Sequence, residues 1–219
     1  MATQVETPRD ILLVEPARIR PMMGISVLES LPTTGPGGAT ERARLDTGDL
    51  LKIRTGRGVW HAEGIGDDEL REGKAGTAMR GLLFWVNLAR KDKGVEPSAQ
   101  VVRAGEMALR HDGDALVRVL VGEDSPVELG TPGLILDVEL PRGGTFSTPV
   151  PSDFNGFVYV LEGEATLGAN QLREKRSDIG VLGHGSTVSV TEAAPGTRFM
   201  LMAARPYGES PIFNGPYVD

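Results

Sequence analysis

The sequence lacks cysteine altogether and contains only three histidines, His61, His111 and His184, among its 219 residues. Without cysteine the chain can form no disulfide bond, and it has no thiolate to act as a nucleophile or as a metal ligand. The small number of histidines limits the imidazole groups that a metal site could use. Disulfide-based folds and cysteine-based catalysis are therefore excluded.

Long apolar runs and an excess of positive charge are also missing. No apolar run approaches the roughly 18 residues that a membrane-spanning helix needs, and residues 1–10 lack the apolar core of a secretion signal. The formal net charge is −7, which disfavours binding of nucleic acid through the overall field. We expect a cytoplasmic protein, a monomer or a homodimer, with no nucleic-acid or membrane partner.

Glycine and proline, by contrast, are abundant: 29 and 15 residues, together about a fifth of the chain, against about 12% in an average protein. They separate short segments in which apolar and polar residues alternate, the pattern of strands joined by tight turns. Helical character is weak and confined to residues 67–73 and 98–107. These features predict an all-β fold. The expected strands are residues 50–54, 59–63, 81–88, 116–121, 134–140, 157–161, 187–190 and 199–203.

One pattern occurs twice along the chain. A strand-like run that contains Leu-Glu is followed about 20 residues later by a Gly-containing turn and another strand, first within residues 26–49 and again within residues 159–185. A unit of this kind, used twice, predicts two tandem barrels. We expect the first barrel over residues 1–110 and the second over residues 111–219, with the polar residues 111–113 as the linker between them.

The most distinctive motifs lie in the first half. Residues 55–63 read Thr-Gly-Arg-Gly-Val-Trp-His-Ala-Glu, and residues 81–88 read Gly-Leu-Leu-Phe-Trp-Val-Asn-Leu. Both runs resemble motifs of the pirin family of the cupin superfamily, and the resemblance extends from residue 16 to residue 219. It implies two tandem cupin barrels, each a double-stranded β-helix or jelly roll, with the active pocket inside the N-terminal one. Further collinear matches are residues 95–97, 131–132, 149–151, 181–183 and 215–218.

The resemblance also implies a metal site, which this sequence retains only in part. Pirins hold iron or a similar metal through a His-x-His pair and through the histidine and glutamate that fall on His61 and Glu63 here. The pair should lie just before residues 25–29, but residues 17–24 contain no histidine. His61 and Glu63 share one face of a strand, and two ligands are only a fragment of an iron or zinc site. We therefore expect no bound metal and no cofactor.

The pocket implied by the resemblance is mostly apolar, with a few polar groups, which is the usual form of a small-molecule site. Leucine stands at position 83, where pirins commonly carry a glutamine that faces the metal. The expected substrate-binding residues are Met22, Met23, Trp60, Leu83 and Trp85, and the expected catalytic residues are His61, Glu63, Lys52 and Arg54.

Most of these residues also have a purely structural interpretation. The two methionines can fill gaps in a core, and Trp85 can pack between sheets. Lys52 and Arg54 point to solvent if the phase of their strand is shifted by one residue. The histidine–glutamate pair can persist as a buried hydrogen-bonded pair without a metal.

In the C-terminal half, we expect His111 to lie in a solvated linker and His184 at the rim of the barrel. No His-x-Glu pair is found there, so this barrel is expected to be filled by side chains rather than to bind a ligand. The aromatic residues expected to serve as packing material are Phe146, Phe154, Phe157 and Tyr159.

Three hypotheses of function follow. The first is a metal-independent enzyme of natural-product biosynthesis, a cyclase that folds an apolar, polyketide-like small-molecule substrate for an intramolecular Diels–Alder cycloaddition. Such a reaction is accelerated mainly by holding the substrate near its attack geometry, and hydrogen bonds from Lys52, Arg54 or protonated His61 would polarise a carbonyl of the substrate. The second is an iron-dependent, quercetinase-like dioxygenase. The third is a non-catalytic regulatory binding protein, like the pirins that act on transcription factors.

Overall fold

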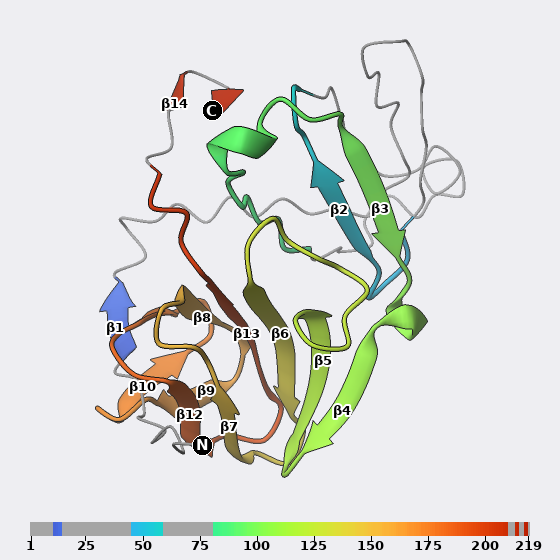
Figure 1. Cartoon of the computed structure of the whole chain (residues 1–219). Helices are drawn as coiled ribbons and strands as arrows, with labels where there is room; N and C mark the ends of the chain where they lie inside the picture. The colour runs from blue at the N-terminus through green and yellow to red at the C-terminus, as the bar shows by residue number, and fades with distance from the viewer. Residues whose placement is uncertain (1–10, 15–44, 59–80, 210–212, 215–216, 219) are drawn as a thin grey trace, which may run out of the picture. The chain divides into compact units, whose positions relative to one another are not determined.

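The computed structural model describes residues 11–14, 45–58, 81–209, 213–214 and 217–218 (Figure 1). The chain divides into two compact units. The C-terminal unit consists of residues 1–21 and 107–207, and the N-terminal unit consists of residues 22–106 and 208–219. Within the described ranges the regular structure is strands together with two short 3₁₀ helices, η1 (Arg90–Asp92) and η2 (Ala104–Glu106). The expected all-β class is confirmed.

Two antiparallel sheets build the C-terminal unit. The strands of the larger sheet are β1 (Ile11–Val14), β4 (Ala108–Asp112), β5 (Ala115–Val121), β6 (Gly133–Leu140), β8 (Asn155–Glu162), β11 (Ile179–Leu182) and β13 (Thr197–Ala204). Those of the smaller sheet are β7 (Gly144–Pro149), β9 (Glu164–Leu167), β10 (Leu172–Lys175) and β12 (Thr187–Ala193). The order is β1-β11-β8-β13-β6-β5-β4 in the larger sheet and β10-β9-β12-β7 in the smaller, so the chain passes repeatedly from one sheet to the other.

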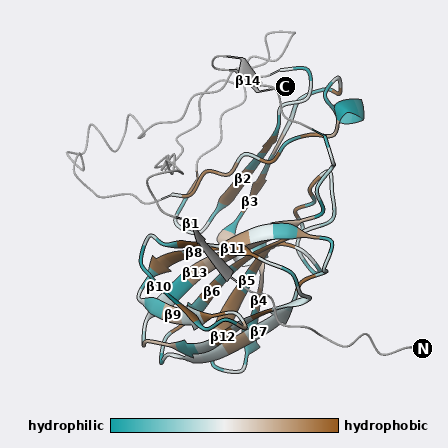
Figure 2. Ribbon diagram, turned by 90° about the vertical axis from the view of Figure 1, so that its left-hand side faces the viewer, coloured by the Kyte–Doolittle hydropathy of each residue, from teal (hydrophilic) through white to brown (hydrophobic). Residues whose placement is uncertain are grey.

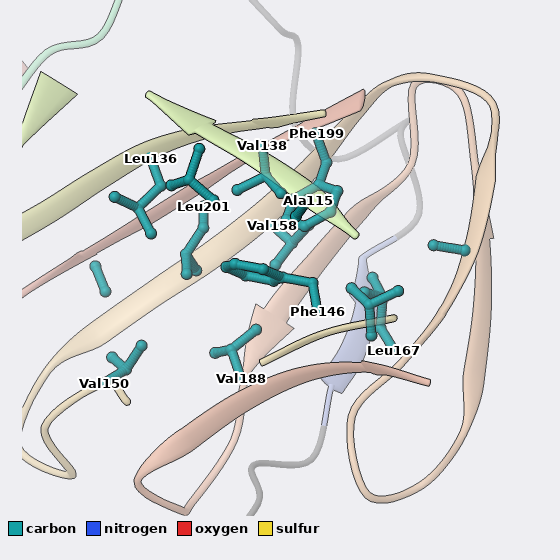
Figure 3. Close-up of a cluster of buried hydrophobic side chains, with 14 of the residues drawn as sticks. Ala115, Leu136, Val138, Phe146, Val150, Val158, Leu167, Val188, Phe199 and Leu201 are labelled. Atoms are coloured by element: carbon teal, nitrogen blue, oxygen red, sulfur yellow. The ribbon is translucent and has the colours of Figure 1, made fainter. Parts of the chain in front are cut away.

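A hydrophobic core joins the two sheets. Along β5, Ala115, Val117 and Val119 are buried while the residues between them are partly exposed, so one face of the strand is apolar. Figure 2 shows this mixture of hydrophobic and hydrophilic residues along the strands. Side chains from the two sheets point toward one another (Figure 3), and the rings of Phe146 on β7 and Phe199 on β13 meet edge to face with centroids 5.8 Å apart.

The interior of this barrel is filled by side chains, as expected. Phe146 and Phe154 belong to the core cluster, whose members are at most 8% exposed. Phe157 and Tyr159 lie outside the cluster, because they alternate along β8 with buried valines and therefore lie on the other face of the sheet. Most of the material that fills the barrel is aliphatic: Val117, Val119, Leu136, Val138, Leu140, Val150, Val158, Leu167, Val188, Val190 and Leu201.

The corner between β8 and β9 depends on a single glycine. Gly163 has φ +74°, and a Cβ built there would lie 2.5 Å from the hydroxyl of Thr197, so only glycine fits. Thr197 is fully buried, and its hydroxyl lies within hydrogen-bond distance of the Ala194 and Glu164 carbonyl oxygens, at 2.7 and 2.9 Å. The Leu-Glu-Gly pattern therefore marks the point where the chain leaves one sheet for the other.

The described part of the N-terminal unit is smaller. Its strands are β2 (Leu50–Arg54) and β3 (Ser98–Val102), which form an antiparallel ribbon, and the short pair β14 (Phe213–Asn214) and β15 (Tyr217–Val218). The side chain of Asp49, 5% exposed, joins the start of β2 to the end of β3: it accepts hydrogen bonds from the Asp46 and Ala104 amides and from the Arg103 guanidinium. Burial alone would raise the pKa of Asp49, but these hydrogen bonds outweigh it and hold the pKa below its ordinary value.

Most of the expected strands are present. The segments at 50–54, 116–121, 134–140, 157–161, 187–190 and 199–203 correspond to β2, β5, β6, β8, β12 and β13. The expected strand at 81–88 is wrong, because residues 81–89 have no regular secondary structure. The helical expectation for 98–107 is also wrong, because β3 occupies its first half and only η2 follows. The expected strand at 59–63 and the expected helix at 67–73 lie outside the described residues.

The prediction of a linker at residues 111–113 is wrong. His111 lies in β4, opposite Leu116 of β5, and residues 113–114 form the tight turn between these two strands. Polar side chains there reflect an exposed hairpin rather than a connection between barrels. The proposed domain limits at residues 110 and 111 stay a prediction. Among the described residues, no helix has the length and apolar character required to cross a membrane.

Candidate functional site

The β2–β3 ribbon carries the two basic residues expected in the pocket. Lys52 lies opposite Gln100, and Arg54 lies opposite Ser98. Directly opposed residues share a face, and side chains alternate along a strand, so these four lie on one face of the ribbon. This polar face also carries the apolar pair Leu50 and Val102 at its other end, and Val102 is buried. The other face carries Leu51, Ile53, Ala99 and Val101.

Lys52 is half-buried and Arg54 is exposed. A role for them in the pocket requires the polar face of the ribbon to be the inner one, and this stays a prediction. If the apolar face is the inner one, Leu51 and Ile53 line the interior and both cations point to solvent. Because the register shows which residues share a face, the orientation of the ribbon alone decides whether the side chains of Lys52, Arg54, Gln100 and Ser98 face the interior.

The Gly-Arg-Gly turn leads directly to the segment that contains His61 and Glu63. Gly56 has φ +49°, and a Cβ at this position would collide with the carbonyl oxygen of Val95. The amide of Arg57 donates a hydrogen bond to the same oxygen at 2.9 Å, and its guanidinium pairs with Glu96 at 2.6 Å. Two motifs of the sequence, residues 55–58 and 95–97, therefore lie against each other.

The segment 81–89 presents apolar side chains. Leu83, Trp85 and Val86 are 37%, 63% and 41% exposed. The end of the segment is anchored, because Ala89 is buried and the amide of Arg90 donates a hydrogen bond of 2.7 Å to the Glu209 carboxylate. Leu83 and Trp85 were expected to contact the substrate; the structure places them on one anchored segment, and their contact with a substrate stays a prediction.

The remaining expected site residues, Met22, Met23, Trp60, His61 and Glu63, lie outside the described residues. Sequence reasoning missed two residues of the described part. Asp49 was visible only as part of a Thr-Gly-Asp turn. Glu174 lies in the run Leu-Arg-Glu-Lys, whose charges resemble an exposed hairpin, yet its side chain is fully buried.

Comparison with known proteins identifies the family. The family model for the pirin C-terminal cupin domain matches residues 135–219. Rat pirin is 32% identical over 182 residues, which cover 80% of this chain and 60% of rat pirin. The chain belongs to the pirin family. It spans about 60% of the length of the curated relatives it matches first.

Solved structures agree on the fold. A quercetin 2,3-dioxygenase from Acinetobacter baumannii has a TM-score of 0.71 at 24% identity, covering 89% of this chain and 67% of that one. The Escherichia coli pirin YhhW, solved in complex with nickel(II), has a TM-score of 0.57 at 13% identity, covering 91% of this chain and 77% of that one. At these identities the likeness shows the fold alone. The expected fold class, all-β with tandem cupin barrels, is confirmed.

The residues present do not fit the histidine-rich iron site that the family resemblance implies. His111 lies in β4 and His184 in the turn after β11; both are exposed and both belong to the C-terminal unit. The N-terminal unit therefore contains one histidine, His61, and no cysteine. Its own side chains cannot supply the two histidines that a non-haem iron centre needs beside a carboxylate. Among the described residues, no group of three histidine, cysteine, aspartate or glutamate side chains is arranged to hold a metal ion.

Proposed function

We propose that this pirin is a metal-independent enzyme of natural-product biosynthesis, a cyclase that folds an apolar, polyketide-like substrate in its N-terminal barrel. The observation that carries the proposal is the composition of the N-terminal unit: a pirin motif set is retained there, while the histidines of the pirin metal site are reduced to His61. If the fold is retained while its metal ligands are lost, any reaction that it catalyses must rely on the remaining side chains.

An intramolecular Diels–Alder cycloaddition meets this requirement. A diene and an alkene of one substrate molecule form two new carbon–carbon σ bonds at the expense of two π bonds, and the remaining π electrons form a new double bond. No atom, proton or electron enters or leaves, so no redox centre is needed. Catalysis consists mainly of holding the substrate near its attack geometry, a contribution of about 7–11 kcal/mol in favourable cases.

Two groups of described residues support the proposal. The exposed side chains of Leu83, Trp85 and Val86 provide apolar area that a folded polyketide-like chain would cover. Lys52 and Arg54 provide cations on one face of the β2–β3 ribbon. A hydrogen bond from either to a carbonyl conjugated with the alkene would lower the barrier by stabilising charge that develops on that oxygen.

The partners and surroundings of the protein are part of the same proposal. Its partner is an apolar small molecule, and it acts as a monomer or homodimer in the cytoplasm. It contacts neither nucleic acid nor membrane, in keeping with a net charge of −7.

A quercetinase-like dioxygenase is the second candidate, because a quercetin 2,3-dioxygenase is among the structures with the same fold. This activity would require iron held by His61, Glu63 and carboxylates or solvent in place of the missing histidines. The donor set of the N-terminal unit argues against it.

One experiment separates the two candidates. The full chain is incubated under air with two probes: quercetin, and a linear 1,3-diene tethered to an α,β-unsaturated ketone. Each reaction is run with EDTA and with added Fe²⁺. We expect a cyclised isomer of unchanged mass to form faster than in buffer, equally in EDTA and in Fe²⁺, with no consumption of quercetin. Iron-dependent oxygenation of quercetin without acceleration of the diene would reject the cyclase.

The His61→Ala and Glu63→Ala variants sharpen this test. In a cyclase that depends on shape, each should lower the rate of cyclisation by at most about 10²-fold, the scale of one polarising hydrogen bond or one proton donor. In a residual metal enzyme each should abolish activity outright, because a remaining ligand would be lost. Circular dichroism of each variant confirms that it is folded.

A further inference from the structure

A carboxyl group is buried inside the C-terminal barrel. Glu174, on β10, has a relative exposure of 0%. Within the part of the chain that the structure describes, neither of its carboxyl oxygens has a hydrogen-bond partner. Buried polar groups are nearly always hydrogen-bonded, so an unpaired carboxyl is a costly feature that calls for a reason.

The pairing of β10 shows which way Glu174 faces. It lies opposite Ala165 of β9, which belongs to the core cluster, and Leu172, two residues earlier on the same strand, packs against that cluster. Residues that oppose one another share a face, so Glu174 points into the barrel. Its strand neighbours Arg173 and Lys175 are exposed and point the other way, where Arg173 pairs with Glu164 of β9.

The groups around Glu174 favour its neutral form. Glu174 lies opposite the apolar, buried Ala165 of β9, and β10 also lies close to β8, whose buried residues include Val158 and Val160. The charged group that acts on it is Asp178, in the turn after β10, whose carboxylate accepts a hydrogen bond of 2.9 Å from the Lys175 amide. Burial, and secondarily the charge of Asp178, raise the pKa of Glu174 to about 7.

The strand that carries Glu174 is a short edge strand. β10 has four residues, lies at the edge of its sheet and, among the described strands, pairs with β9 alone. The turn behind it is anchored to β8, because the Ser177 amide donates to the Val160 carbonyl oxygen and the Val160 amide donates to the Asp178 carbonyl oxygen. An edge strand with one neighbour opens at lower cost than a central strand, and here the anchored turn would serve as the pivot.

We propose that Glu174 is a proton-controlled switch for the edge of the C-terminal barrel. In its neutral form it stays inside the barrel and β10 remains paired with β9. On losing its proton, the carboxylate leaves the apolar interior for water and β10 separates from β9. The switch is independent of the activity proposed for the N-terminal unit, and the switching proton is the only group transferred, from the carboxyl to solvent.

Hydrogen–deuterium exchange of the full chain tests this switch. The peptides covering 164–175 are followed at about pH 5.5 and about pH 8.5, with rates corrected for the intrinsic pH dependence of exchange. Linkage with a shift from 4.5 to about 7 predicts that protection of these amides falls about thirtyfold between the two pH values. Amides of residues 115–121, in β5, serve as the internal reference and should keep their protection.

The variants decide whether Glu174 is the cause. Glu174→Gln removes the ionisation and should make protection of 164–175 independent of pH, and Glu174→Met provides a second neutral variant should the glutamine protein fail to fold. Glu192→Gln, which neutralises an exposed carboxylate of β12, should behave like the unmodified chain. The proposal is overturned if protection in the unmodified chain does not change with pH, or if either folded neutral variant shows the same thirtyfold loss.

Discussion

The two units of this pirin differ in where they place their apolar side chains. The C-terminal unit buries a cluster of aliphatic and aromatic side chains, each at most 8% exposed. The described part of the N-terminal unit buries only Leu45, Ala89 and Val102, and it leaves Trp85 63% exposed. The first pattern is that of a barrel which serves as a support. The second is what a unit needs if apolar groups are kept available for a substrate.

The largest expected effect is in the C-terminal core. Phe199→Ala removes a fully buried ring that contacts Phe146, and it should lower the free energy of unfolding by about 3–5 kcal/mol. Urea unfolding followed by far-UV circular dichroism measures the change. Phe157→Ala, which truncates a half-buried ring on the other face of the larger sheet, is the matched control and should cost clearly less. Equal losses at the two positions would contradict the assignment of the core.

The next effect concerns pH. The pKa of Glu174 in the folded chain, about 7, lies above its unfolded value, so the folded state binds more protons between these values. The contribution of Glu174 to the free energy of unfolding is therefore fully present at pH values below its unfolded pKa. It is lost as pH rises through about 7, and the total loss is about 3 kcal/mol. Urea unfolding at a series of pH values measures the fall. Glu174→Gln should flatten the profile, and an increase in stability over this range would show that the sign is wrong.

A smaller effect is expected at the turn that precedes His61. Gly56→Ala forces a side chain onto φ +49° and against the Val95 carbonyl oxygen, so it should destabilise the N-terminal unit by about 2 kcal/mol. Both tryptophans, Trp60 and Trp85, belong to this unit, so their fluorescence during urea unfolding reports on it. Gly94→Ala, where a Cβ meets nothing within 4 Å, is the control. A loss of similar size at both positions would contradict the proposed packing of the two motifs.

The smallest effect on stability is expected at Trp85. Because its side chain is largely exposed, Trp85→Ala should change the free energy of unfolding by no more than about 0.5 kcal/mol, yet it should slow cyclisation of the diene probe. Leu109→Ala, which truncates an exposed leucine of the C-terminal unit, should change neither quantity. Cyclisation that is unaffected by loss of Trp85 would remove the substrate role of segment 81–89.

The difference in burial between the two units also explains which strands could be predicted from the sequence. Segments 116–121 and 134–140 were predicted because an apolar residue recurs at every second position in each, and one face of each strand is buried. Strands β9 and β10 were missed because they are short and charged, and Glu174 breaks the rule that a buried position is apolar. Residues 81–88 were predicted as a strand from β-favouring side chains, but they find no strand partner among the described residues.

The candidate site could be predicted only through residue types. The absence of the histidine pair can be read from the sequence, because it depends only on which residue types are present. The orientation of Lys52 and Arg54 is not, because a shift by one residue exchanges the faces of a strand and leaves the composition unchanged. The register of β2 with β3 groups these two cations with Gln100 and Ser98, which no pattern within residues 50–54 could indicate.

The central claim, that this pirin works without a metal, is tested most directly by elemental analysis of the full chain. The protein is produced in iron-supplemented medium, purified without chelators and measured by inductively coupled plasma mass spectrometry. The account predicts iron, nickel and zinc each far below one atom per chain, and cyclisation of the diene probe that is unchanged after dialysis against EDTA. A metal content near one atom per chain, removed by EDTA together with the activity, would contradict it.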